Sequence, residues 1–114
     1  MATLTKQTIT ESGADLTLAA ATAGGDQFTN TGKEILVIQN GDVAGKTVTI
    51  TAQQTSAIVS GLEIVTKNNQ SVTIAAGGVG VIGPFNTHSF NDSNKAVQIT
   101  YSAVTSLKVA VISN

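Results

Sequence analysis

The chain of 114 residues contains no cysteine, no tryptophan and no arginine, and it has a single histidine and a single proline. Without cysteine there are no disulfides, thiolate metal sites or cysteine nucleophiles, and one histidine excludes a multi-histidine metal cage. Charged residues make up only 11% of the chain, against about 25% in an average soluble domain. The six lysines are dispersed and form no basic stripe. We therefore expect no metal, no cofactor and no nucleic-acid partner.

Long apolar runs are also missing. A membrane-spanning helix needs about 18 or more consecutive apolar residues, and no stretch of this sequence approaches that length. The first ten residues, MATLTKQTIT, alternate in polarity and lack the apolar centre of a signal peptide. We therefore expect neither a membrane partner nor a secretion signal. The length of the chain corresponds to one domain.

β-Branched residues are abundant, with 17 Thr, 12 Val and 10 Ile. Their stiff side chains fit a pleated sheet better than a helix. Apolar and polar residues alternate in several short runs, which predicts strands with one buried and one wetted face. The clearest predicted strands are Glu34–Gln39, Thr47–Ala52, Ser71–Ala75, Val79–Ile82, Ala96–Tyr101 and Leu107–Ile112, and weaker ones are Thr3–Thr10, Leu16–Ala19 and Leu62–Val65.

Turn-forming residues separate these runs at regular intervals, as at Asn40-Gly41-Asp42. Even spacing with short links predicts an all-β fold, an antiparallel β-sandwich or jelly-roll-like barrel of about eight short strands. Residues 1–13 are expected to form either an extended N-terminal arm or an edge strand, and residues 14–114 the single domain. Four consecutive apolar residues in Glu34–Gln39 indicate a strand covered on both faces, by its own fold or by a neighbouring subunit.

Two glycine patterns resemble nucleotide-binding motifs but lack the surroundings that such motifs need. The segment 78–83 matches G-x-G-x-x-G, yet it reads as a strand and continues into Pro84 instead of a helix. The segment 41–47 has three residues between its glycines where a phosphate-binding loop has four, and a strand follows it. His88 is followed by Ser89 and Asp92, but neighbours in one loop do not form a catalytic triad. We therefore expect no catalytic or cofactor-binding residue, no enzymatic activity and no small-molecule substrate.

Several short motifs follow one another in a recognisable order. Phe28, Asn30 and Gly32 come first, and after them the strand EILVIQN, the strand TVTIT, a segment from Val65 through Asn68 to Val72–Ala75, the motif Ile82-Gly83-Pro84-Phe85, and a closing Val-x-Ile-x-Tyr-Ser followed by Leu-x-Val. Across residues 26–112 this order resembles the small all-β virion proteins of tailed bacteriophages, in particular the capsid decoration or cement proteins.

The resemblance implies a non-enzymatic protein that binds the outer surface of the mature head and stabilises the lattice by bridging major capsid proteins. It also implies a homotrimer that is made in the host cytoplasm and resides on the capsid surface of the virion. A formal charge of −1 is compatible with such association, because a net charge this small causes little repulsion between copies of the chain. The alternatives are another phage structural component, such as a tail tube, a head–tail connector or a fibre-associated β-domain, and a carbohydrate- or receptor-binding module.

Two groups of residues are the predicted contacts of such a protein. An extended N-terminal segment can add a strand to an exposed sheet edge of a partner. Capsid contact is therefore assigned to the arm residues Thr3, Leu4, Lys6, Thr8 and Ile9. Contact between subunits is assigned to the loop residues Phe85, His88 and Phe90.

Overall fold

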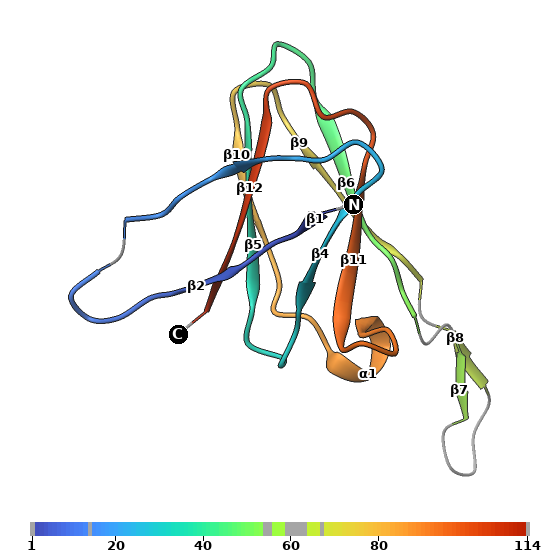
Figure 1. The fold of residues 1–114 in the computed structure, drawn as a ribbon. Coiled ribbons are helices and arrows are strands. Elements are labelled where there is room, and N and C mark those ends of the chain that lie inside the picture. The colour runs from blue at the N-terminus through green and yellow to red at the C-terminus, as the bar shows by residue number, and fades with distance from the viewer. Residues whose placement is uncertain (1, 14, 54–55, 59–63, 67, 114) are drawn as a thin grey trace.

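Two five-stranded sheets pack face to face in the computed structural model of the chain (Figure 1). The structure describes residues 2–13, 15–53, 56–58, 64–66 and 68–113, and for residues 56–58 and 64–66 it describes the backbone. Sheet A has the strand order β1 (Ala2–Thr3), β4 (Asp26–Thr29), β11 (Ala96–Tyr101), β6 (Lys46–Ile50) and β9 (Gln70–Ile74). Sheet B has the order β10 (Val79–Ile82), β5 (Ile35–Asn40), β12 (Leu107–Ser113) and β2 (Lys6–Thr8), and β3 (Ala19–Ala20) also pairs with β12.

Two small elements accompany the sandwich. The strands β7 (Ser56–Ile58) and β8 (Ile64–Thr66) pair with each other and stand away from the two sheets in Figure 1. The predicted strand Leu62–Val65 overlaps β8, and its first two residues lie outside the described residues. A four-residue helix, α1 (Thr87–Phe90), begins after Asn86, whose side chain accepts hydrogen bonds from the backbone N–H groups of His88 and Ser89.

Alternation along the strands places one set of side chains between the sheets. In β6, Val48 and Ile50 are fully buried while Thr47 and Thr49 are partly exposed on the other side. Buried apolar residues from both sheets fill the space between them: Phe28, Leu36, Ile38, Val48, Ile50, Val97, Ile99, Leu107, Val109 and Val111. Removing this apolar surface from water is the main driving force for the fold.

The all-β fold predicted from the sequence is confirmed, but the sheets are mixed and not purely antiparallel. The pairings of β1 with β4 and of β2 with β12 are parallel. Both belong to the N-terminal segment, which reaches edge strands that it does not follow in the chain, so no hairpin dictates its direction. The described residues form twelve strands, more than expected, because the predicted strand Thr3–Thr10 is interrupted and because β4 and β7 were not predicted.

The segment of residues 2–8 crosses from one sheet to the other. The backbone N–H of Leu4 donates to the carbonyl of Gln27 in sheet A at 2.7 Å, and the N–H of Ile9 donates to the carbonyl of Ser113 in sheet B at 2.7 Å. The Leu4 side chain packs against the core. Residues 2–8 therefore lie at the edges of both sheets on one side of the sandwich, and residues 9–13 continue beyond them.

Candidate interaction surface

The outer face of sheet A is polar and carries no charged side chain along its strands. Hydroxyl groups face one another across β6 and β9, where Thr47 lies 3.3 Å from Thr73 and Thr49 lies 3.2 Å from Ser71, measured between side-chain oxygens. Side-chain amides continue the pattern, because Gln98 Nε2 donates to Gln27 Oε1 at 2.7 Å. Such a face hydrogen-bonds well to water and to itself, so it needs no covering partner.

The outer face of sheet B is mostly apolar, although the exposed residues Gln39 and Lys108 lie on it in the same row as Val79. In β10, Gly80 points inward, since a Cβ placed on it would lie 2.2 Å from Ile74 Cδ1, and the alternation turns the neighbouring valines outward. Val79 and Val81 are 64% and 63% exposed. Strand register continues this surface across β5 and β12. The B face, as we name it, consists of Ile35, Val37, Val79, Val81, Ala110 and Ile112.

The B face explains the apolar run in the predicted strand Glu34–Gln39. Leu36 and Ile38 are fully buried in the core, while Val37 pairs in register with Val81 and Ala110 on the outer side. Val37 is buried by its own neighbours and Ile35 is half-buried. The exposed part of the B face is therefore Val79 and Val81, with Ile35 and Ile112 half-buried and Ala110 buried, and exposed apolar side chains that lie together favour a contact site.

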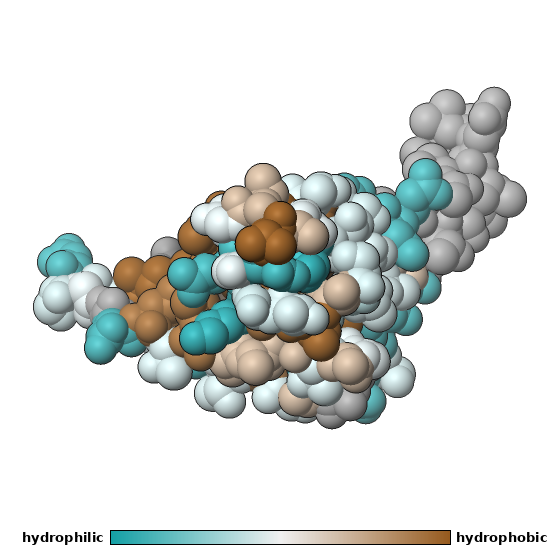
Figure 2. All heavy atoms as spheres, turned by 90° about the horizontal axis from the view of Figure 1, so that it is seen from above, coloured by the Kyte–Doolittle hydropathy of each residue, from teal (hydrophilic) through white to brown (hydrophobic). Residues whose placement is uncertain are grey.

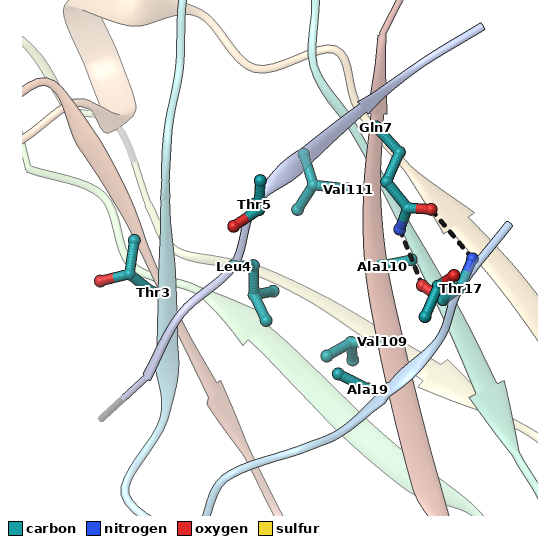
Figure 3. Close-up of a pocket in the computed structure, with 9 residues that line it drawn as sticks. All are labelled: Thr3, Leu4, Thr5, Gln7, Thr17, Ala19, Val109, Ala110 and Val111. Atoms are coloured by element: carbon teal, nitrogen blue, oxygen red, sulfur yellow. Dashed lines mark hydrogen bonds between the residues drawn. The ribbon is translucent and has the colours of Figure 1, made fainter.

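Residues 9–13 and 15–18, the projecting segment, extend away from the sandwich next to β2 (Figure 1). Gln7 fixes the point where this segment returns. Its Nε2 donates to the carbonyl of Thr17 at 2.7 Å and its Oε1 accepts from the Thr17 N–H at 2.9 Å (Figure 3). Ile9 and Leu16 remain 42% and 38% exposed, and Figure 2 shows apolar residues gathered between the tip of the segment and the body of the protein.

A pocket of about 410 Å³ opens where the N-terminal segment and β3 meet β12 (Figure 3). Its apolar lining is Leu4, Ala19, Val109, Ala110 and Val111, and its polar lining is Thr3, Thr5, Gln7 and Thr17. None of these side chains is titratable near neutral pH. The pocket therefore offers a seat for an apolar group and no acid–base chemistry.

The five residues predicted for capsid contact lie along this side of the molecule. Thr3 ends β1, and Lys6 and Thr8 bound β2. Ile9 opens the projecting segment. All of these are exposed except Leu4, which is half-buried against the core. The sequence prediction thus falls on one continuous stretch, although part of that stretch also belongs to the sandwich.

Glu34 is a buried acid beside this stretch, at 1% exposure. It accepts hydrogen bonds from the Thr31 N–H at 2.5 Å and from the Thr31 hydroxyl, and its Oε2 lies 3.5 Å from Lys6 Nζ. Burial pushes the pKa of Glu34 upward, but the hydrogen bonds from Thr31 outweigh it, so the pKa lies below its ordinary value.

The lowered pKa of Glu34 predicts sensitivity to acid. A carboxyl group whose pKa is lower in the folded state stabilises the fold fully above its unfolded pKa, here about 4.5, and this contribution disappears as pH falls through the folded pKa. We expect the free energy of unfolding to fall below about pH 5 and to fall less steeply in Glu34→Gln. Urea denaturation across this range checks it, and equal slopes for the two proteins would contradict the assignment.

The residues predicted for subunit contact divide differently. Phe85 and Phe90 are each 4% exposed. The ring of Phe85 lies 5.6 Å from that of Phe28 and 6.1 Å from that of Phe90, measured between centroids. These two side chains are therefore committed to the core of their own chain, and of the three predicted residues only His88 is exposed. The prediction is corrected for these two residues, because Phe90 ends α1 facing inward and Phe85, which precedes the helix, packs its ring against those of Phe28 and Phe90.

The described residues contain no group of three or more His, Asp or Glu side chains that would hold a metal ion. No helix in the described part of the chain is both long and apolar enough to cross a membrane. Comparison with protein families, curated proteins and solved structures gives no match to this chain. The function is therefore argued from the surface itself.

Sequence reasoning did not anticipate Val79 and Val81 as surface residues. The run Val79–Ile82 was predicted as a strand, but its orientation depends on what lies behind Gly80. The sequence did hold one signal for this orientation, which is Gly80 between the two valines. A glycine within a strand leaves room for a large side chain on the core side, and the valines then face outward. The role of Gln7 had no comparable signal, since its partner is the backbone of Thr17.

Proposed function

We propose that this chain is a non-enzymatic capsid decoration (cement) protein of a tailed phage, which binds the outer surface of the mature head and bridges major capsid proteins. The observation that supports it most is the contrast between the two outer faces. Sheet A presents hydroxyls and amides, whereas sheet B presents the apolar B face with the projecting segment at its side. The order of motifs from residue 26 to residue 112 supplies the kind of partner.

In this proposal the projecting segment and the B face make the contact with capsid protein. The apolar side chains of the B face lose no charge hydration when they are covered, so the cost of desolvation lies with Lys108 on that face and with Glu11 and Asp15 in the projecting segment. A head offers many symmetry-related sites, and a copy that touches two capsid subunits opposes their separation. The resemblance adds two finer proposals, a homotrimeric state and a jelly-roll-like strand arrangement. It also implies that the proposed protein resides on the capsid surface of the virion.

The paired substitution Ile9→Ser with Leu16→Ser tests the role of the projecting segment. Covering each side chain is worth about 1 to 1.5 kcal/mol, so we expect affinity for empty expanded heads to fall about 30- to 160-fold in a co-sedimentation assay. The melting temperature should change little, because both side chains are already about 40% exposed in the free protein.

Val43→Ser is the matched control, since Val43 is 94% exposed in the loop between β5 and β6. It makes the same kind of change away from the proposed contact and should leave binding at the wild-type level. Equal binding by the paired variant and the wild type would remove the projecting segment from the contact. Rings or filaments that ignore heads would instead favour a tail component.

A further inference from the structure

Sheet B is covered at one edge and open at the other. At β12 the edge is taken up by β2 and β3, whereas β10 pairs only with β5. The N–H of Asn40 donates to the carbonyl of Gly78 at 2.9 Å, and antiparallel bonding alternates, so Gly80 and Ile82 exchange backbone bonds with β5. The backbone N–H and C=O groups of Val79 and Val81 therefore point away from β5, outward at the open edge of the sheet. No hydrogen bond among the described residues uses them.

This edge lacks the features that keep sheet edges from pairing. Edge strands are commonly protected by lysine, by proline within the strand or by a bulge. β10 has none of these, and residues 68–87 contain no charged side chain. Its two outward side chains, Val79 and Val81, are more than 60% exposed. A strand can therefore be added to β10 without burying a charged side chain of residues 68–87.

We propose that β10 joins two copies of this chain, paired antiparallel about a two-fold axis at Gly80. The sequence Val79-Gly80-Val81 reads the same in both directions. The two-fold arrangement sets Val79 of each copy opposite Val81 of the other, and these are the residues with outward backbone groups. About four hydrogen bonds then form between the copies, and the two B faces become one continuous surface.

The self-complementary sequence favours a second copy over a foreign strand as the occupant. Pairing with itself satisfies every outward backbone group of the two valines and sets valine against valine on the outer side. The contact goes beyond the proposed function, because a two-fold contact is not part of a three-fold ring and requires no capsid. Together with the proposed homotrimer, this contact joins two trimers into an assembly of six chains, so it predicts a solution mass that is an even multiple of 11.5 kDa.

Disulfide trapping tests the register directly, because the natural chain has no cysteine. In the proposed pairing Val79 lies opposite Val81 of the other copy, with Cα atoms about 5.5 Å apart, which a disulfide spans. Two copies of Val79→Cys place their cysteines on the order of 8 to 9 Å apart, which is too far. We expect mild oxidation to link a mixture of Val79→Cys and Val81→Cys proteins far more than either alone. A mixture that links no better than the single variants would overturn the proposal.

Val81→Pro tests the same contact without a cross-link. Proline removes an outward N–H but leaves the bonds between β10 and β5 in place, as at other sheet edges. We expect its mass by sedimentation equilibrium to be half that of the wild type, whereas Val81→Thr, which keeps the N–H and the shape, retains the wild-type mass.

A wild-type mass that is an odd multiple of the chain mass, or an unchanged mass for a folded Val81→Pro variant, would contradict the two-fold contact. If circular dichroism shows that Val81→Pro does not fold, the cross-linking result decides. Binding to empty heads is measured on the same samples, so failure of capsid binding and failure of the two-fold contact are separate outcomes. Loss of head binding in Val81→Pro at unchanged mass would mean that a capsid strand occupies β10 instead.

Discussion

Deleting residues 1–8 is expected to lower the free energy of unfolding by about 3 to 5 kcal/mol, through lost packing and lost edge pairing. Leu4 packs against the core from this segment. The deletion also removes β1 from the edge of β4 and β2 from the edge of β12. For a domain of this size the loss corresponds to a fall of about 10 to 25 °C in melting temperature. Differential scanning calorimetry of the purified proteins measures it.

The control for this deletion replaces residues 10–16 by a short Gly-Ser linker. That variant keeps β2, β3 and the Gln7 bonds to Thr17, so its stability should stay within about 1 kcal/mol of the wild type. It should nevertheless bind heads weakly, because it lacks Leu16. A deletion of residues 1–8 that melts like the wild type would show that these residues act as a detached arm and not as edge strands.

Tyr101→Phe is expected to cost about 2 to 4 kcal/mol, although it removes a single oxygen atom. The Tyr101 hydroxyl donates to Asp26 Oδ2 at 2.7 Å. Asp26 is fully buried, its Oδ2 accepts one further bond from the Thr22 N–H at 3.2 Å, and its Oδ1 has no hydrogen-bond partner among the described residues. Burial, together with Asp26, raises the pKa of the phenol well above its usual value, so it remains a donor.

A double-mutant cycle separates this pair from general packing. Asp26→Asn changes the group that accepts the hydrogen bond from the phenol, so the combined variant should be destabilised by less than the sum of the two single variants. Urea denaturation should be followed by far-UV circular dichroism, because Tyr101 is the only tyrosine and the chain has no tryptophan. Additive effects of the two substitutions would contradict a coupled buried pair.

Asp26 also shows why one central strand of sheet A escaped prediction from the sequence. The inward positions of β4 are Asp26 and Phe28, so the strand has no repeated apolar alternation. Its burial depends on a tyrosine 75 positions further along the chain. In β6, β11 and β12, by contrast, valine and isoleucine alternate with other residues, and the strands lie close to where that pattern predicts them.

The candidate surface was predictable only in part, for a related reason. The N-terminal residues Thr3 to Ile9 visibly alternate in polarity, but their course between the sheets is fixed by the bonds of Leu4 to Gln27 and of Ile9 to Ser113, partners that are distant in the chain. The aromatic residues at 85 and 90 read as loop residues, because their burial depends on ring contacts with one another and with Phe28, which is distant in the chain. The B face needs the register of three strands, which no local pattern specifies.

The central claim, that the chain binds and strengthens a phage head, is tested most directly by the melting temperature of empty expanded heads with and without saturating protein. A protein that binds the assembled lattice but not the separated capsid subunits stabilises the lattice by mass action. We therefore expect the melting temperature of the heads to rise by about 5 °C or more and to level off at a fixed ratio of chain to capsid protein. Unchanged melting at saturating protein would contradict the proposed function.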